Sequence, residues 1–201
     1  MKNQDQQTRN GILAAATSIF ANHGYTGSFV QDIVNKAKIT KPTLYYHFGN
    51  KAGLYLAVVN SAHDIRFELM QRAAGGNDTL AKQLEDILSV LFRFARQHRD
   101  LMRLCFMTAF ASPGEIPGQD EYFKKGRRNF EFLHTLIKQG VTSGELSSKH
   151  KTEDLTTAIF GQILFYGITQ AVTTKHVWKR RGARQIVELF LQGASPKRRN
   201  G

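Results

Sequence analysis

The sequence predicts an all-α protein with a small helix-turn-helix domain at the amino end and a larger helical domain after it. Apolar residues recur three and four positions apart through most of the chain, which is the period of an amphipathic helix. Strand alternation, internal repeats and low-complexity tracts are nearly absent. Glycine- and proline-containing breaks divide the pattern into helix-sized segments. We therefore expect a small helix-turn-helix domain over residues 1–50 and a larger helical domain over residues 51–201.

Residues 28–37 predict the first helix of the helix-turn-helix pair. Ser28 and Gln31 have the spacing of a capping box, which predicts that this helix begins near Ser28. Its apolar positions fall on one side, which predicts that this face is buried. These positions are Val30, Ile33, Val34 and Ala37.

Residues 41–48 predict a second, short helix after a tight corner. Thr40 can cap it with its hydroxyl, and Pro42 is tolerated in the first turn because amides there lack intrahelical partners. Leu44 and Phe48 lie four apart and are expected to face the core. The remaining residues are left mostly outward: Lys41, Pro42, Thr43, Tyr45, Tyr46 and His47.

The outward side chains of the second helix suit a DNA groove. A major groove admits one helix, whose first turns reach base edges, while hydroxyls and cations near its ends reach phosphates. Gly49 and Asn50 close this helix, and Lys51 opens the next with a cation placed to meet the DNA backbone. Each of these residues also has an interpretation without DNA. Tyr45 and Tyr46 would pack on the preceding helix, and Lys41 and Lys51 would be merely solvated.

The run from residue 20 to residue 59 resembles the DNA-binding domain of the tetracycline-repressor (TetR) family of bacterial transcription regulators. The residues that carry the resemblance are Phe20, Gly24, Tyr25, Ser28, Thr43, Leu44, Tyr45, His47, Phe48 and Lys51. Lys38 departs from the glycine usual at the corner, so a positive φ there would be mildly strained. Val34 stands where alanine is usual, and Ala52 where an acidic residue is usual.

The resemblance implies a set of DNA contacts. Gln31 and residues 41–43 would lie near bases, since Gln and Lys can bond to adenine and guanine edges. Five others would lie mostly on the DNA backbone: Thr40, Tyr45, Tyr46, His47 and Lys51. The full predicted set is Ser28, Gln31, Thr40, Lys41, Pro42, Thr43, Tyr45, Tyr46, His47 and Lys51.

The middle of the chain is rich in phenylalanine and methionine. The resemblance implies a ligand cavity there, and an aromatic lining with a few polar groups suits an apolar or aromatic small-molecule effector. The alternative for any one of these residues is ordinary core. The predicted pocket residues are Phe67, Phe92, Arg103, Met107, Phe110, Phe130 and His134.

The last two predicted helices carry more apolar residues than one helix pair at the edge of a domain would bury. The resemblance implies that they pair with their copies in a homodimer, and a palindromic operator also requires two-fold symmetry. The alternative is burial inside one subunit. The predicted interface residues are Ile159, Ile163, Tyr166, Ile186 and Phe190.

The bulk composition favours a polyanionic partner. The chain has 201 residues and a formal net charge of +12, from 28 basic and 16 acidic residues, with a pI near 10.0. The polar amino end has no signal-peptide core and there is no long apolar run, which predicts a cytoplasmic protein without a membrane partner. The single cysteine, Cys105, has apolar neighbours that predict a buried thiol.

Catalytic and cofactor motifs are missing from the sequence. The seven histidines form no H-x-x-x-H pair, and there is no cysteine cluster, Walker loop or G-x-S-x-G motif. We expect no enzyme activity, no metal and no cofactor. The predicted function is a ligand-responsive repressor that binds a palindromic operator as a dimer. Two alternatives stay open: an architectural DNA-binding protein that binds by charge alone, and a helical enzyme.

Overall fold

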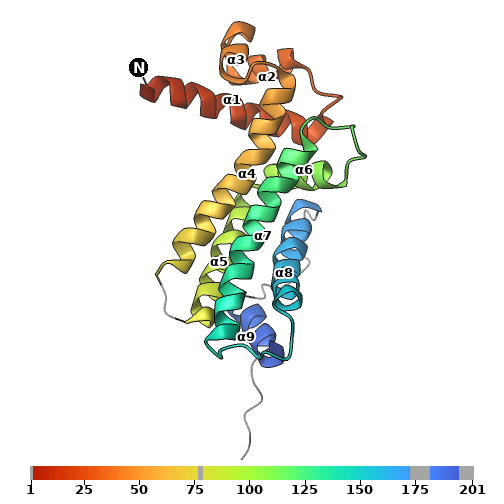
Figure 1. Ribbon diagram of the computed structural model, residues 1–201. Coiled ribbons are helices and arrows are strands. Elements are labelled where there is room, and N and C mark those ends of the chain that lie inside the picture. The colour runs from red at the N-terminus through yellow and green to blue at the C-terminus, as the bar shows by residue number, and fades with distance from the viewer. Residues whose placement is uncertain (1, 77–78, 173–181, 195–201) are drawn as a thin grey trace, which may run out of the picture. The chain divides into compact units, whose positions relative to one another are not determined.

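The computed structural model describes residues 2–76, 79–172 and 182–194. These residues form nine α-helices and contain no β-strand, which confirms the predicted all-α class (Figure 1). The helices are α1 (Lys2–His23), α2 (Val30–Ala37), α3 (Lys41–Phe48), α4 (Lys51–Ala74), α5 (Leu80–Gln97), α6 (Arg99–Phe110), α7 (Gln119–Thr142), α8 (Thr152–Val172) and α9 (Ala183–Ala194).

The helices pack into two compact units. The first unit comprises Met1–Asp64 and His98–Lys125, and the second comprises Ile65–Gln97 and Gly126–Gly201. The long helices α4 and α7 each contribute to both units. Residues 1–50 lie wholly in the first unit, and we retain the boundary after residue 50 as a proposed division of function.

The first unit is built around α1, which packs against α2 and α6. Ile12, Ala16 and Phe20 form a fully buried stripe along α1, as their helical spacing predicts. Ile33 of α2 and Leu44 of α3 are also fully buried. The two short helices are therefore anchored by one apolar residue or pair each, and their other faces remain available to solvent.

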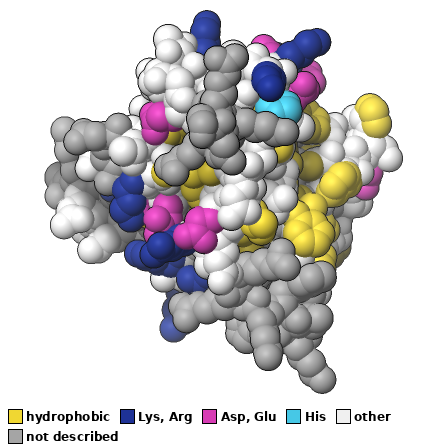
Figure 2. Space-filling model, turned by 90° about the horizontal axis from the view of Figure 1, so that it is seen from below, with side chains coloured by type: hydrophobic (Ala, Val, Ile, Leu, Met, Phe, Trp, Pro, Cys, Tyr) yellow, Lys and Arg dark blue, Asp and Glu magenta, His cyan; other side chains and the backbone are white. Residues whose placement is uncertain are grey.

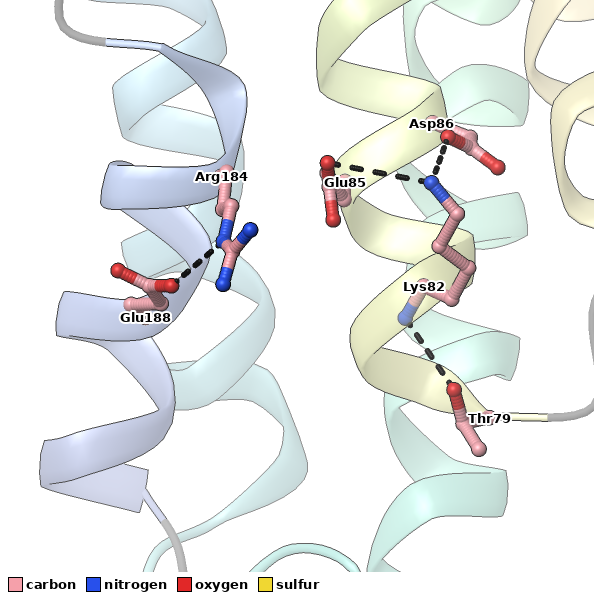
Figure 3. A network of polar contacts seen from close by, with 6 residues as sticks. All are labelled: Thr79, Lys82, Glu85, Asp86, Arg184 and Glu188. Atoms are coloured by element: carbon pink, nitrogen blue, oxygen red, sulfur yellow. Dashed lines mark hydrogen bonds and ion pairs between the residues drawn. The ribbon is translucent and has the colours of Figure 1, made fainter.

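The second unit is centred on α5, which packs against α8 and α9. Its core contains Leu84 and Ile87 of α5, Leu133 of α7, Ile159 of α8 and Val187 of α9. Polar side chains on α5 and α9 pair within their own helices at the surface (Figure 3). Lys82 Nζ lies 2.8 Å from Asp86 Oδ1, and Arg184 Nε donates to Glu188 Oε1 at 2.8 Å. The contact between α5 and its neighbours is thus mainly apolar.

Candidate nucleic-acid interface

The start of α2 differs from the sequence-based prediction. The helix begins at Val30, and Phe29 occupies the N-cap position with extended backbone angles and no side-chain capping bond. Ser28 is buried, and its hydroxyl donates to the Gly24 carbonyl at 2.6 Å. The predicted capping box of Ser28 and Gln31 is therefore wrong, because the serine hydroxyl closes the preceding turn instead. Its burial also leaves Ser28 unavailable to DNA.

The corner between α2 and α3 contains a lysine in a glycine-like conformation. Lys38 has φ 54° and ψ 46°, which confirms the positive φ considered from the sequence. The Lys38 amide donates to Asn35 O at 3.2 Å, and the Ile39 amide donates to Val34 O at 3.0 Å. These two bonds close the end of α2 in the manner of a left-handed helix cap. A non-glycine residue in this region costs about 1–2 kcal/mol.

The beginning of α3 is as predicted. Thr40 is the N-cap, and its hydroxyl oxygen accepts the Thr43 amide at 3.4 Å. The two threonine hydroxyls lie 2.9 Å apart. Pro42 lies in the first turn, and Leu44 points into the core with no exposed surface. The cap and the single buried leucine fix which face of α3 is turned outward.

The end of α3 leads directly into α4. Gly49 has φ 73°, and its amide donates to Tyr45 O at 2.8 Å. The Asn50 side-chain oxygen accepts the Gly53 amide at 2.8 Å and so caps α4. Lys51 is consequently the first residue of α4, as the sequence predicts. Only Gly49 and Asn50 separate α3 from Lys51.

The exposed residues of α2 and α3 form a mixed aromatic and polar surface. Tyr45 is 43% exposed and Tyr46 is 79% exposed, which excludes the alternative that both rings are packed beneath the preceding helix. Thr43 is half-buried, and the exposed Gln31 donates its side-chain amide to Asn35 Oδ1 at 2.9 Å. The other predicted contacts that are exposed are Thr40, Lys41 and Pro42.

His47 differs from its neighbours on α3. Its side chain is only 6% exposed, and its Nε2 lies 3.7 Å from Asp5 Oδ1 on α1. The adjacent Phe48 ring lies 5.3 Å from the Arg9 guanidinium, also on α1. The predicted phosphate contact by His47 is not supported by this burial, because the imidazole faces α1. Asp5 and Arg9 were missed from the sequence because their helix has a weak apolar pattern at its amino end.

Lys51 is half-buried and lies against an aromatic ring. Its Nζ is 4.6 Å from the centre of the Tyr25 ring, and burial lowers the pKa of this lysine below its ordinary value. Tyr25 contributed to the sequence motif, but the contact with Lys51 was not foreseen. A tyrosine 26 positions before a lysine gives no local periodic signal.

The predicted pocket residues divide between the two units. Phe67, Phe92, Phe130 and His134 belong to the second unit, whereas Arg103, Met107 and Phe110 belong to the first. Arg103 Nη2 donates to Asn22 Oδ1 at 3.0 Å and also to Asp100. Phe110 is 78% exposed. We therefore keep only the four residues of the second unit as pocket candidates.

Those four residues lie among other aromatic side chains. Phe92 stacks on Tyr166 with ring centres 3.8 Å apart, and Phe67 meets Phe132 edge to face at 5.8 Å. Phe130 lies 5.3 Å from Phe160 in the same type of arrangement. His134 Nε2 lies 3.5 Å from Glu153 Oε1. The second unit thus contains a cluster of aromatic side chains, and His134 lies beside Phe130 of this cluster.

The predicted dimer residues mostly face the core of one subunit. Ile159 and Ile163 are buried, while Ile186 and Phe190 are partly buried and pack on the same core. Tyr166 accepts a hydrogen bond from Arg96 Nη1 at 3.0 Å. Ile159 and Ile163 are therefore corrected to core residues. The phase of α8 was hard to choose because apolar residues occur on all its sides.

The exposed apolar residues of α8 and α9 are different ones. They are Leu164, Phe165, Val172 and Leu189. By length and composition alone α8 is apolar enough to cross a membrane, although one side of it packs on α5 and α9. Figure 2 shows that hydrophobic side chains also reach the molecular surface in groups.

The fold and the exposed face of α3 define a helix-turn-helix DNA-binding protein. Residues 12–58 match the family model described as bacterial regulatory proteins, tetR family. The DNA-binding region of the chain thus matches the TetR family, as the sequence motif predicts. Within the residues that the structure describes, no group of three or more His, Cys, Asp or Glu side chains is placed to hold a metal ion.

Known proteins resemble the chain over different lengths. The transcriptional activator FasR of Mycolicibacterium smegmatis is 26% identical over 113 residues, which cover 56% of this chain and 52% of FasR. The chain thus spans about half of that relative. The uncharacterised regulator YdgC of Bacillus subtilis is 24% identical over 204 residues, covering 98% of this chain and 97% of YdgC.

A solved structure resembles the chain along almost its whole length. The putative fatty acid metabolism regulator of Clostridium perfringens has a TM-score of 0.75 and 21% identity, and the match covers 93% of this chain and 100% of that one. This likeness confirms the fold, with the amino-terminal helix-turn-helix followed by a helical domain.

Proposed function

We propose that the protein is a ligand-responsive transcriptional regulator, in the simplest case a repressor, that binds a palindromic operator as a homodimer in the cytoplasm. The observation that supports this proposal most directly is the outward face of α3. Tyr46 is 79% exposed on a helix that the buried Leu44 anchors on its other side, and Lys41 at the start of the same helix is exposed too. Exposed aromatic rings are costly in water, and a DNA groove gives them contacts.

In this proposal α3 lies in the major groove. Lys41 at its first position can bond to guanine edges, and Gln31 on α2 can reach an adenine once it leaves Asn35. Thr40, Tyr45, Tyr46 and Lys51 lie on the sugar–phosphate backbone. Ser28 and His47 act indirectly, because their side chains are buried and hold the unit together.

Two copies of the chain are needed for a palindromic site. The exposed Leu164 and Phe165 of α8 and Leu189 of α9 are the surface proposed for this pairing. A dimer presents its recognition helices about 34–36 Å apart, which is one turn of duplex. Pairing through apolar side chains also removes them from water.

The effector would act by shifting a population of dimers. We propose an apolar or aromatic small molecule, bound near Phe67, Phe92, Phe130 and His134, that favours a state with the wrong separation of recognition helices. It can do so only through its different affinities for the two states. A thousandfold loss of operator affinity requires about 4 kcal/mol of coupling.

Selection of bound fragments from a random DNA pool tests the proposal. We expect an inverted repeat, because both base contacts and two-fold symmetry are required. Salt titration on the selected and a scrambled duplex then measures specificity, with an expected gap of several kcal/mol. Equal affinity for both duplexes would favour the architectural alternative. Recovery of a single half-site would support the proposed base recognition but contradict the proposed dimer.

A further inference from the structure

The first residue of α4 carries its ammonium group on an aromatic ring. Lys51 Nζ lies 4.6 Å from the centre of the Tyr25 ring, within the range of a cation–π contact. Tyr25 lies in the segment between α1 and α2, so the contact joins two parts of the chain. A lysine side chain normally has many rotamers, and the ring selects those that bring the ammonium group over it.

The Tyr25 ring is itself held by two buried rings. It meets Tyr55 edge to face, with centres 5.1 Å apart and planes at 71°. It meets Phe20 at 6.3 Å, and Phe20 and Tyr55 are 5.0 Å apart. Phe20 has 0% and Tyr55 1% of its surface exposed. Rings packed in this way have little room to move, so Tyr25 is a firm support.

The Tyr55 hydroxyl extends the support to α6. It lies 2.7 Å from the Thr108 hydroxyl, and that hydroxyl also donates to Leu104 O at 2.8 Å. Since a threonine hydroxyl has one proton, Tyr55 is the donor to Thr108. Thr108 is fully buried. All the residues of this chain of contacts belong to the first unit.

We propose that Tyr25 is a positioning residue for DNA binding, which holds the Lys51 ammonium group in place for a backbone phosphate. This inference rests on the proposed role of Lys51 as a phosphate contact. A lysine that is already ordered loses less conformational entropy when it binds. Tyr55 and Thr108 keep the ring in position, and Tyr25 itself need not touch DNA.

The main test compares substitutions on the selected operator duplex. We expect Tyr25→Leu to weaken binding about three- to tenfold, the size of one lost ordering contribution. Tyr25→Phe keeps the ring and should change affinity less than twofold. Lys51→Gln should weaken binding and lower the slope of log affinity against log salt by about 0.9. Phe123→Leu, at an exposed ring elsewhere in the first unit, is the matched control.

The double variant separates positioning from a general structural effect. If Tyr25 acts through Lys51, then Tyr25→Leu has no further effect on affinity in the Lys51→Gln protein. Additive losses would overturn the proposal, because they would show that Tyr25 supports the domain by another route. If Lys51→Gln alone changes nothing, the phosphate contact itself is wrong. If only Tyr25→Leu changes nothing, the proposed function stands and the positioning role falls.

A fluorinated series keeps the test valid even if Tyr25→Leu fails to fold. Phenylalanine with increasing ring fluorination is introduced at position 25, which weakens the ring quadrupole with little change in shape. We expect operator affinity to fall stepwise along the series, while the thermal unfolding midpoint changes little. Constant affinity across the series would overturn the proposal.

Discussion

The helices α3 and α8 both expose aromatic side chains, but in different surroundings. On α3, Tyr46 is 79% exposed on a short helix that also carries Lys41, Thr43 and His47. On α8, Phe165 is 56% exposed on a helix whose 21 residues include no lysine or arginine. An aromatic ring among cations suits a polyanion, whereas one among aliphatic side chains suits another protein surface. The neighbours of an exposed ring therefore indicate its partner better than its exposure does.

The two helices also differ in how their exposed face is fixed. The face of α3 is set by a cap at Thr40 and one buried leucine, so it is defined within a few residues. The face of α8 is set by packing on α5 and α9, which are distant in sequence. Substitutions of exposed residues on each of the two helices test this comparison.

The largest effect is expected on α8. Phe165→Glu would place a carboxylate in the proposed pairing surface, where an unpaired buried charge costs about 3 kcal/mol or more. Sedimentation should show dimer dissociation at concentrations about a hundredfold higher than for the unchanged protein. Operator binding should weaken with it, because one half-site is lost.

The matched control for this change lies in the first unit. Phe123 is 50% exposed, and Phe123→Glu should leave the dimer unchanged. A Phe165→Glu protein with unaltered sedimentation would contradict the assignment of α8 as an interface. Its aromatic surface would then require another partner.

A smaller effect is expected at the start of α3. Lys41→Ala should weaken the free energy of binding to the selected operator by about 1–3 kcal/mol and should relax the base preference at one position. Tyr46→Ala should weaken binding more evenly across sequences, since its proposed contact is to the backbone. Mobility-shift measurements with operator variants distinguish these patterns. Equal losses on every sequence for both variants would mean that Lys41 is also a backbone contact.

Local signals in the sequence predicted the bounds of α3. Thr40, Pro42 and Gly49 each act within one helical turn, so the sequence was enough to place both ends of α3. Ser28 was misassigned because a serine before a helix can bond forwards or backwards, and only the packed turn decides. The contact of His47 with Asp5 depends on how α1 crosses α3. No local pattern specifies that crossing.

The same distinction explains the errors in the second unit. Ile159 and Ile163 were predicted to face a partner, but a helix with apolar residues all round gives no preferred side. The pocket candidates divide between the two units because α6, which carries Arg103, Met107 and Phe110, belongs to the first unit. Such assignments need tertiary contacts.

A substitution at Ser28 tests whether this residue contributes to folding stability without contacting DNA. Ser28→Ala removes a buried hydroxyl that donates to Gly24 O at 2.6 Å, and should lower the free energy of unfolding by about 1–2 kcal/mol. At temperatures where the protein stays folded, the salt dependence of operator binding should be unchanged. A reduced salt slope would instead restore Ser28 as a DNA contact.

The smallest effect is expected at the corner, where stability and binding should move in opposite directions. Lys38 has φ 54°, so Lys38→Gly relieves left-handed strain of about 1–2 kcal/mol, partly offset by about 0.5–1 kcal/mol of glycine backbone entropy. We expect a net gain of about 0.5–1 kcal/mol in denaturant unfolding. The same change removes one exposed cation from the DNA-binding unit.

Loss of that cation should reduce the salt slope of DNA binding by up to about 0.9. Lys38→Asn is the matched control, because asparagine tolerates a positive φ and also lacks the charge. It should reproduce the binding change with a smaller gain in stability. If both variants bind DNA with an unchanged salt slope, then Lys38 lies away from the phosphates. The backbone strain at Lys38 would then not be offset by a gain in DNA binding. If Lys38→Gly is less stable, then contacts of the lysine side chain outweigh the backbone strain.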